Sequence, residues 1–196
     1  MAKTSSTMLP LNTPMPEFAL PSTDDILISS SDFLGKAVLV MFICNHCPYV
    51  THVLPELVKL SGDFKWRGLD MVGINSNDVN KYPDDDPSKM KILIKQLSLS
   101  RLASEGNAIY RGRPFLYLFD ETQEVAKKFH AACTPDFYLF DEKGLLVYRG
   151  RLDSSTPGNG EVLNGSELRS AIEATLGGFS VSADQKASVG CNIKWK

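Results

Sequence analysis

The segment AVLVMFICNHCPYV, residues 37–50, decides the fold of this chain. Its first seven residues are apolar without interruption, which is the pattern of a strand buried on both faces, as in a parallel sheet. Cys44 and Cys47 follow, with Pro48 directly after them. Apolar residues then return at positions 50, 53, 54, 57 and 58, which is helical spacing. The segment therefore predicts a buried strand that leads through a Cys-x-x-Cys pair into a helix.

Similar patterns predict the elements on either side. Residues 17–20 and 26–28 are short strand candidates around Pro21-Ser22-Thr23-Asp24-Asp25, which favours a hairpin. The later strands are predicted at residues 69–75, 115–119, 137–140 and 145–148, of which the last two form a hairpin across Asp141-Glu142-Lys143-Gly144. Four helices are predicted. The first follows Pro48, the second runs from residue 87 to about 99, the third opens at residues 120–123 and runs to about 130, and the fourth runs from Ser166 to the glycines at 177 and 178.

Three polar segments are expected to cap these helices. Asp86 precedes Pro87 and fits an N-cap, which we prefer to a metal loop built from the neighbouring aspartates. Residues 120–123, Asp-Glu-Thr-Gln, resemble a capping box. Ser166 is expected to cap the last helix, which Gly177-Gly178 end.

The order of elements predicts a single α/β domain. Parallel strands come first and an antiparallel pair comes late, so we expect a central mixed sheet flanked by helices. Residues 1–16 contain three prolines and are predicted to be an extended or mobile lead-in. Residues 17–178 form the predicted domain, with an N-terminal hairpin, and residues 179–196 form a C-terminal tail.

Composition excludes several classes of function. The chain has 196 residues and a net charge of −2, so it has no basic surplus with which to bind nucleic acid or a membrane surface. The N-terminal residues contain no continuous apolar stretch of the kind found in secretory signals. We therefore expect a cytoplasmic protein. Structural disulfides are uncommon in that compartment, so a Cys-x-x-Cys pair there favours catalysis or metal binding.

The position of the pair favours redox chemistry. A helix N-terminus offers free N–H groups and a partial positive charge, which stabilise the nucleophilic thiolate form of cysteine. The helix dipole supplies only about 0.3–1 kcal/mol, so hydrogen bonds and a nearby cation are also needed. His46 lies between the two cysteines and is the candidate cation. We expect Cys44 at the helix start to be the reactive thiolate.

A zinc site is the weaker alternative. Closed zinc sites need four ligands, which usually come as two close pairs. Cys133 and Cys191 are isolated in the sequence, although His46, His52 or His130 could add a ligand. The sequence implies no cofactor, and we assign no metal ligand.

Three segments together resemble a known superfamily. They are VLVMFICNHCPYV (38–50), FLYLFDETQEVAKKF (115–129) and ACTPDFYLFDEKGLLVYRGRLD (132–153). The chain resembles the thioredoxin-like superfamily over residues 14–177, in the redoxin branch that holds AhpC/TSA peroxiredoxins and TlpA/ResA thiol oxidoreductases. The resemblance implies a thioredoxin-like fold. It also implies that Pro135, in Thr134-Pro135, is a cis-proline that faces the cysteine pair and shapes the groove for an extended substrate.

The chain departs from two patterns of this superfamily. Peroxiredoxins carry threonine three residues before the peroxidatic cysteine, whereas Met41 stands there before Cys44. Thioredoxin carries a buried aspartate six residues before its first cysteine, whereas this chain has Val38. The base that deprotonates Cys47 is therefore not identified by the resemblance, and His46, Glu56 or a water molecule are the alternatives.

The predicted site follows from these arguments. Cys44, Cys47, His46 and Pro135 are assigned catalytic roles, and Asn45, Pro48 and Thr134 are assigned to the substrate groove. Cys133 and Cys191 are candidates for additional redox thiols. For Cys133 a buried structural role is the favoured interpretation. For Cys191, a mobile resolving thiol and an incidental residue of a packed tail are equally good interpretations.

Three functions fit this site. The first is a thiol–disulfide oxidoreductase in which Cys44 attacks a substrate disulfide and Cys47 resolves the mixed disulfide. The second is a thiol peroxidase in which Cys44 attacks a hydroperoxide. The third is a metal-binding or metal-delivery protein that uses Cys44, Cys47 and a histidine. The expected partners are a protein disulfide, a small-molecule disulfide or a hydroperoxide as substrate, and a dithiol as electron donor.

Overall fold

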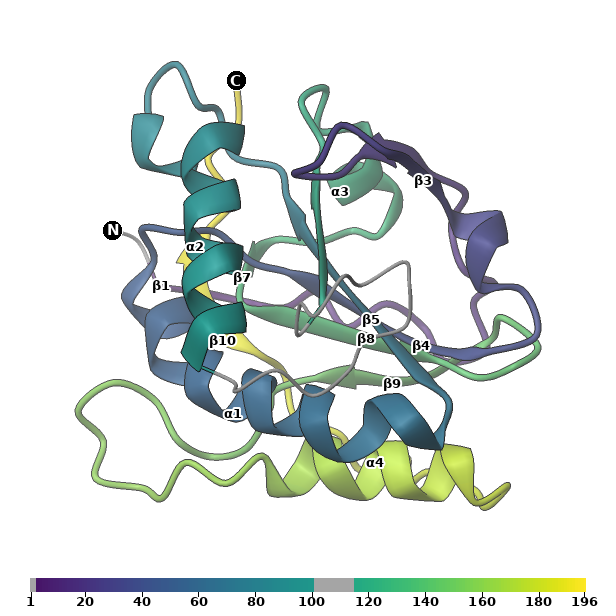
Figure 1. Cartoon of the computed structure of the whole chain (residues 1–196). Coiled ribbons are helices and arrows are strands. Elements are labelled where there is room, and N and C mark those ends of the chain that lie inside the picture. Colours follow the sequence, from purple (N-terminus) through teal and green to yellow (C-terminus); the bar gives the residue numbers. More distant parts are fainter. Residues whose placement is uncertain (1–2, 101–114) are drawn as a thin grey trace.

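A five-stranded mixed sheet forms the centre of the computed structural model, which describes residues 3–100 and 115–196 (Figure 1). Its strands are β4 (Ala37–Phe42), β5 (Leu69–Asn75), β6 (Leu116–Phe119), β8 (Asp136–Phe140) and β9 (Leu146–Gly150). They lie in the order β6-β5-β4-β8-β9. β4, β5 and β6 are parallel, whereas β8 and β9 are antiparallel to their neighbours. The predicted α/β class with a central mixed sheet is confirmed.

β4 is the middle strand of the sheet, and all six of its residues are buried. Side chains alternate across a strand, and here Leu39 and Met41 pack into the core on one face. Val38, Val40 and Phe42 pack into the core on the other face. The continuous apolar run in the sequence therefore reflects burial on both sides of the sheet.

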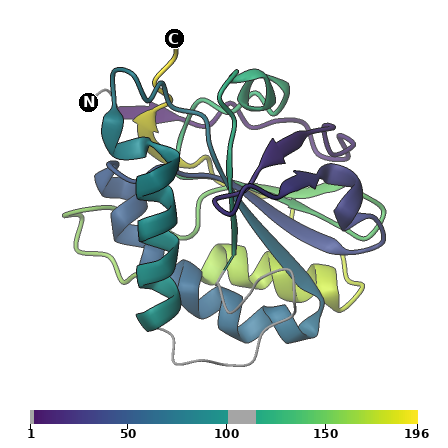
Figure 2. The ribbon, with the colours of Figure 1, turned by 45° about the horizontal axis from the view of Figure 1, so that its top comes forward.

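Helices and a hairpin cover the two faces (Figures 1 and 2). The face that holds Leu39 packs against α1 (Pro48–Phe64), α2 (Pro87–Ser100) and α4 (Ser166–Leu176). The opposite face packs against α3 (Glu124–Lys128) and the hairpin of β2 (Ala19–Pro21) and β3 (Leu27–Ser29). Short 3-10 helices lie at η1 (Ser30–Phe33), η2 (Lys65–Arg67) and η3 (Pro83–Asp85). Among the described residues, no helix is long and apolar enough to cross a membrane.

A second sheet of three short strands joins the two ends of the chain. It consists of β1 (Lys3–Ser5), β10 (Val189–Asn192) and β7 (Cys133–Thr134), with β10 in the middle and antiparallel to both neighbours. Residues of both the predicted extended or mobile lead-in and the predicted C-terminal tail pair in this sheet, so these parts of the two segments are extended and packed; residues 1–2 lie outside the described part. Pairing of this kind depends on contacts between residues far apart in sequence, which local patterns do not reveal.

The predicted capping box at residues 120–123 is wrong. α3 begins only at Glu124, and its N-cap residue is Gln123, which has left-handed backbone angles and makes no side-chain cap. Asp120 is fully buried and instead accepts hydrogen bonds from Ser76 Oγ and from the backbone N–H of Ala126. The carboxylate thus joins α3 to the end of β5, and the helix is shorter than expected.

The other predicted caps have different outcomes. Asp86 caps α2 as expected, because its carboxylate accepts from the N–H of Ser88 at 2.8 Å and the helix begins at Pro87. Ser166 does not cap α4, because it is already the first helical residue. The carboxylate of Asp153 accepts from the N–H of Gly165, which precedes the helix, at 2.6 Å.

Candidate active site

The Cys-x-x-Cys pair lies between the end of β4 and the start of α1. Cys44 follows the strand, and Cys47 is the N-cap residue of the helix, with Pro48 at its first position. Both cysteine side chains are buried. The expectation that Cys44 sits at the helix start is therefore wrong, because residues 44–46 form a loop and the N-terminus of α1 is at Cys47.

Thr134 contacts both sulfurs from the opposite side. Its hydroxyl lies 3.4 Å from Cys44 Sγ, and its carbonyl oxygen lies 3.2 Å from Cys47 Sγ. The peptide bond between Thr134 and Pro135 is cis, as the sequence resemblance implied. β7 and the cis peptide therefore hold one residue against both members of the pair.

Asp85 is a buried acid beside Cys44 that the sequence did not single out. One carboxylate oxygen accepts from the backbone N–H groups of Asn45 and His46, at 2.7 and 3.3 Å. The other accepts from Asn77 Nδ2 at 2.7 Å and lies 2.6 Å from His46 Nδ1. The N–H groups that could have stabilised a Cys44 thiolate are thus bonded to Asp85 instead.

The ring of His46 is held between an acid and an aromatic ring. Its pKa is raised, chiefly by the hydrogen bond to Asp85, although burial works in the opposite direction. The ring also stacks on Tyr82, with 5.2 Å between ring centroids. Because the Asp85 carboxylate pairs directly with the imidazolium, the positive charge expected to act on Cys44 is largely compensated. Nε2 of His46 is buried and, among the described residues, has no hydrogen-bond partner.

The two thiols of the pair are unequal. The pKa of Cys47 is lowered to about 4, chiefly by the hydrogen bond from Cys44, with further donors in the thiol of Cys191 and the N–H of Val50. The pKa of Cys44 is raised by that same bond, by burial and by the charge of Asp85. The pair therefore holds one negative charge, which these donors place mainly on Cys47.

Thr134 opposes this distribution of charge. Its carbonyl oxygen can accept a hydrogen bond from Cys47 only when the Cys47 thiol is protonated. Its hydroxyl lowers the pKa of Cys44 by hydrogen bonding. The proton between the two sulfurs can therefore move toward Cys47, with Thr134 stabilising the form in which Cys44 is the thiolate.

The two remaining cysteines are also free and buried. Cys133 lies on β7 with its thiol 3.7 Å from the carbonyl oxygen of Pro135, and burial raises its pKa. This arrangement favours the structural interpretation. Cys191 lies on β10, and its thiol forms a hydrogen bond with Cys47. It is neither on a mobile tail nor remote from the pair.

The other predicted residues are placed as follows. Asn45 donates to the carbonyl of Asp84 at 2.9 Å and accepts from the hydroxyl of Tyr117 at 3.1 Å, so its side chain is part of the loop structure. Pro48 opens α1. Glu56 is an unsuitable base for Cys47, because its buried carboxylate pairs with Arg169 at 2.6 Å.

One group of side chains could hold a metal ion. Ligand atoms of Cys44, His46 and Asp85 lie within 4.8 Å of one another. A thiolate, an imidazole and a carboxylate suit a borderline-soft ion such as Zn²⁺. In the described structure, however, His46 and Asp85 are hydrogen-bonded to each other.

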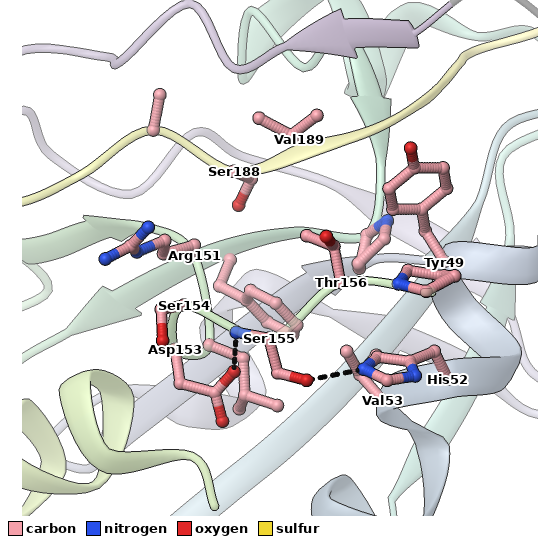
Figure 3. Close-up of a pocket in the computed structure, with 15 residues that line it drawn as sticks. Tyr49, His52, Val53, Arg151, Asp153, Ser154, Ser155, Thr156, Ser188 and Val189 are labelled. Atoms are coloured by element: carbon pink, nitrogen blue, oxygen red, sulfur yellow. Dashed lines mark hydrogen bonds between the residues drawn. The ribbon is translucent and has the colours of Figure 1, made fainter. Parts of the chain in front are cut away.

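A small pocket of about 70 Å³ opens beside the cis-proline (Figure 3). Tyr49 and Val53 of α1 line one side, and Ser188 and Val189 line another. Its third side is the loop after β9, where His52 Nε2 lies 2.8 Å from Ser155 Oγ. Because Pro135 is also in its lining, this pocket is close enough to the pair to receive part of a substrate.

Comparisons with known proteins agree with this fold. The model of the AhpC/TSA family matches residues 11–149. The crystal structure of an uncharacterized conserved protein from Geobacillus kaustophilus superimposes with a TM-score of 0.90 at 46% identity, and the match covers 100% of this chain and 97% of that one. A thiol:disulfide interchange protein of the thioredoxin family from Chlorobium tepidum has a TM-score of 0.61 at 18% identity, covering 84% and 97%, and this likeness shows a thioredoxin-like fold.

One relative is named after an enzymatic activity. The thiol-disulfide oxidoreductase ResA of Halalkalibacterium halodurans is 25% identical over 114 residues. The match covers 56% of this chain and 62% of that protein, so it spans less than two thirds of the relative's length.

Proposed function

The chain belongs to the AhpC/TSA family, and we propose that it is a thiol–disulfide oxidoreductase that cycles the Cys44–Cys47 pair between dithiol and disulfide. One observation carries the proposal. The threonine that precedes a cis-proline contacts both sulfurs, through its hydroxyl at Cys44 and its carbonyl oxygen at Cys47. The similarity to ResA supports the same class of reaction.

The first step is attack by Cys44. In the proposed scheme Cys44 is the sulfur that attacks the substrate; both sulfurs are buried in the described structure. Cys44 passes its proton to the Cys47 thiolate and attacks one sulfur of the substrate disulfide. A bond forms between Cys44 and that sulfur as the substrate S–S bond breaks, and the departing sulfur leaves as a thiolate that takes up a proton. In this scheme the base for Cys44 is Cys47.

The second step is resolution by Cys47. Cys47 loses its proton and attacks Cys44, so that the Cys44–Cys47 disulfide forms and the second substrate sulfur leaves. Two electrons have then passed from the pair to the substrate, and a dithiol donor restores the reduced pair. The Val50 N–H and the helix N-terminus favour the Cys47 thiolate needed for this attack.

The neighbouring residues have positioning roles in this scheme. Thr134 can stabilise the Cys44 thiolate through its hydroxyl and the protonated Cys47 through its carbonyl oxygen. Asp85 and His46 hold the loop between the cysteines, and the charge of Asp85 raises the pKa of Cys44. Pro135 lines the pocket that would receive the group attached to the attacked sulfur.

The thiol peroxidase is less favoured than this function. Met41 stands three residues before Cys44 and is fully buried in β4, so no hydroxyl is available at the position where peroxiredoxins use threonine. The named relative also points to disulfide chemistry rather than to peroxide reduction.

The test is reduction of insulin and of an aromatic disulfide dye with a dithiol as donor. We expect activity in the wild-type protein and a loss of about 100-fold or more in Cys44→Ser, because the nucleophile is gone. Cys133→Ser is the matched control, since that thiol is equally buried but bonds to Pro135, and it should stay active. Disulfide reduction that survives in Cys44→Ser would reject the proposal, and peroxide consumption that depends on Cys44 would favour the peroxidase.

Metal binding is a second candidate function, favoured by the proximity of Cys44, His46 and Asp85. Titration with Zn²⁺ under reducing conditions tests it. Stoichiometric binding that is lost in both Cys44→Ser and His46→Gln would support a metal site. Binding that survives either change would place the ion elsewhere.

A further inference from the structure

Cys191 lies directly beside the residue that holds the cysteine pair. In the three-stranded sheet, Cys191 of β10 pairs with Thr134 of β7. Thr134 is the residue whose hydroxyl and carbonyl contact Cys44 and Cys47. The register of two strands therefore determines where the third thiol lies.

The thiols of Cys44 and Cys191 are consequently both close to the sulfur of Cys47. Thr134 pairs with Cys191 in the sheet and its carbonyl oxygen lies 3.2 Å from Cys47 Sγ. The pKa of Cys47 is lowered by the thiol of Cys44 and by the thiol and backbone N–H of Cys191, which agrees with this proximity. Cys133 provides a contrast, because it lies on the neighbouring strand and is equally buried but its thiol bonds to a carbonyl oxygen. Contact with Cys47, rather than burial, distinguishes Cys191.

β10 is pressed closely against β7. A Cβ atom at Gly190 would lie 2.0 Å from the carbonyl oxygen of Thr134, so only glycine fits there. The strand is held at both ends, because the N–H of Ser6 donates to the carbonyl of Ser188 and the N–H of Ile193 donates to the carbonyl of Ala132. The backbone hydrogen bonds of β10 thus fix the position of Cys191 beside the pair.

The same strand occupies the edge of β7. An extended peptide can bind a sheet by adding a strand to a free edge, and β10 already fills this edge beside Thr134. The chain therefore presents its own cysteine where an extended disulfide substrate could otherwise lie.

We propose that Cys191 is a third redox thiol of this site, which exchanges with the Cys44–Cys47 disulfide to form a Cys47–Cys191 disulfide. The proposal rests on the proposed function, which supplies the oxidised pair. Cys191 loses its proton and its sulfur attacks Cys47. The Cys47–Cys191 bond forms as the Cys44–Cys47 bond breaks, and Cys44 leaves as a thiolate and takes up the proton. No electrons are gained or lost, so the exchange needs no further reagent.

Oxidation of the pair prepares Cys191 for this step. In the reduced protein the pKa of Cys191 is raised to about 12, first by burial and then by its hydrogen bond and charge interaction with Cys47. A Cys47 that is already in a disulfide carries no negative charge, so the contributions of Cys47 disappear. The exchange returns Cys44 to the thiol form, and the new disulfide joins Cys47 at the start of α1 to Cys191 of β10.

The experiment oxidises Cys44→Ser with oxidised glutathione and maps disulfides by mass spectrometry of the digested protein. We expect a peptide that links Cys47 to Cys191, and in the wild-type protein we expect both this link and the Cys44–Cys47 link. A Cys44→Ser protein that carries only glutathione adducts on Cys47 would overturn the proposal. This outcome does not depend on activity, whereas failure of the proposed function appears as a wild-type protein that reduces no disulfide.

Two further variants test whether the link to Cys47 depends on Cys133 and on the position of β10. Cys44→Ser/Cys133→Ser should form the same link, because Cys133 does not contact Cys47 through a hydrogen bond in the described structure. Gly190→Ala in the Cys44→Ser background should slow the link at least about tenfold, because the methyl group pushes β10 away from Thr134. Linking at an unchanged rate in a folded Gly190→Ala protein, or a Cys47–Cys133 link in its place, would overturn the assignment to β10.

Discussion

Two aspartates are fully buried beside the cysteine site, and their charges differ. Asp85 lies at the end of η3 next to Cys44, and its pKa is lowered despite burial because His46, Asn77 and a backbone N–H donate to it. Asp136 begins β8 directly after the cis-proline, and burial raises its pKa to about 7. Two aspartates without exposed surface thus include one with a lowered pKa and one that titrates near neutral pH.

A charged partner explains the difference. Asp85 accepts four hydrogen bonds from the described residues, one of them from the ring of His46, whose positive charge also lowers the pKa of Asp85. The donors that lower the pKa of Asp136 are neutral, namely Tyr138, Ser6, Ser188 and the backbone N–H of Phe137, and they do not offset its burial. A buried carboxylate stays charged only when donors replace its lost water. The charge of Asp85 therefore lies on the Cys44 side of the site, where it adds to the interaction with Cys47 and to burial in raising the pKa of Cys44.

The largest expected effect comes from removing the charge of Asp85. Asp85→Asn should destabilise the protein by roughly 2–4 kcal/mol, because it breaks a buried charged network. The pKa of His46 should fall, since its hydrogen bond to Asp85 is the chief cause of the raised value. The pKa of Cys44 should also fall. Urea unfolding and NMR titration of labelled histidine and cysteine measure these changes.

The matched control is Asp84→Asn. Asp84 is the preceding residue, but its carboxylate is exposed and pairs with Lys89. It should change stability by less than about 0.5 kcal/mol. If both variants behave alike, the difference between a buried and an exposed acid in this loop does not control the site.

The second prediction concerns Asp136. Its folded-state pKa of about 7 is above the unfolded value of about 3.9. The stability that it contributes is therefore complete below pH ~4 and is lost as the pH rises through 7. Between pH 5 and 8, the wild-type protein should lose roughly 3 kcal/mol relative to Asp136→Asn. Urea unfolding of both proteins at several pH values measures this, and parallel curves would show that Asp136 is ionised throughout.

The smallest effect is expected at Thr134. Thr134→Val removes the hydroxyl that lowers the pKa of Cys44 but keeps the backbone carbonyl that faces Cys47. We expect the rate of disulfide reduction near pH 7 to fall about 3–10-fold, the value of one hydrogen bond. Thr134→Ser should restore the rate. An unchanged rate in the valine variant would mean that the hydroxyl of Thr134 does not help to stabilise the Cys44 thiolate.

Local patterns were sufficient for most of the fold. The apolar run before Cys44 predicted β4, and β5 has the predicted bounds of Leu69–Asn75. These elements are determined by which residues must be buried, and burial leaves a direct pattern in the sequence. The caps of α3 and α4 were not predicted correctly, because Asp120 and Asp153 bond to groups that lie far away in the sequence or outside the local cap pattern.

The site was predictable in its chemistry but not in its electrostatics. The cysteine pair could be recognised from residue types and their order, and the cis-proline was implied by the resemblance to the thioredoxin-like superfamily. Asp85 could not, because it stands among three consecutive aspartates and only the 3-10 turn at Pro83–Asp85 determines which one is buried. The contact between Cys191 and Cys47 depends on a strand register, which leaves no pattern in either segment.

The three-stranded sheet has a consequence for biosynthesis. Its outer strand β1 is the first described element of the chain, and its middle strand β10 is the last. Translation proceeds from the N-terminus, so β4, α1 and β7 can all fold while β10 is still inside the ribosome. During that interval the edge of β7 is open and Cys47 lacks its contact with Cys191. The nascent chain therefore passes through a stage in which its thiols are more exposed to cellular oxidants and disulfides than they will be in the finished protein.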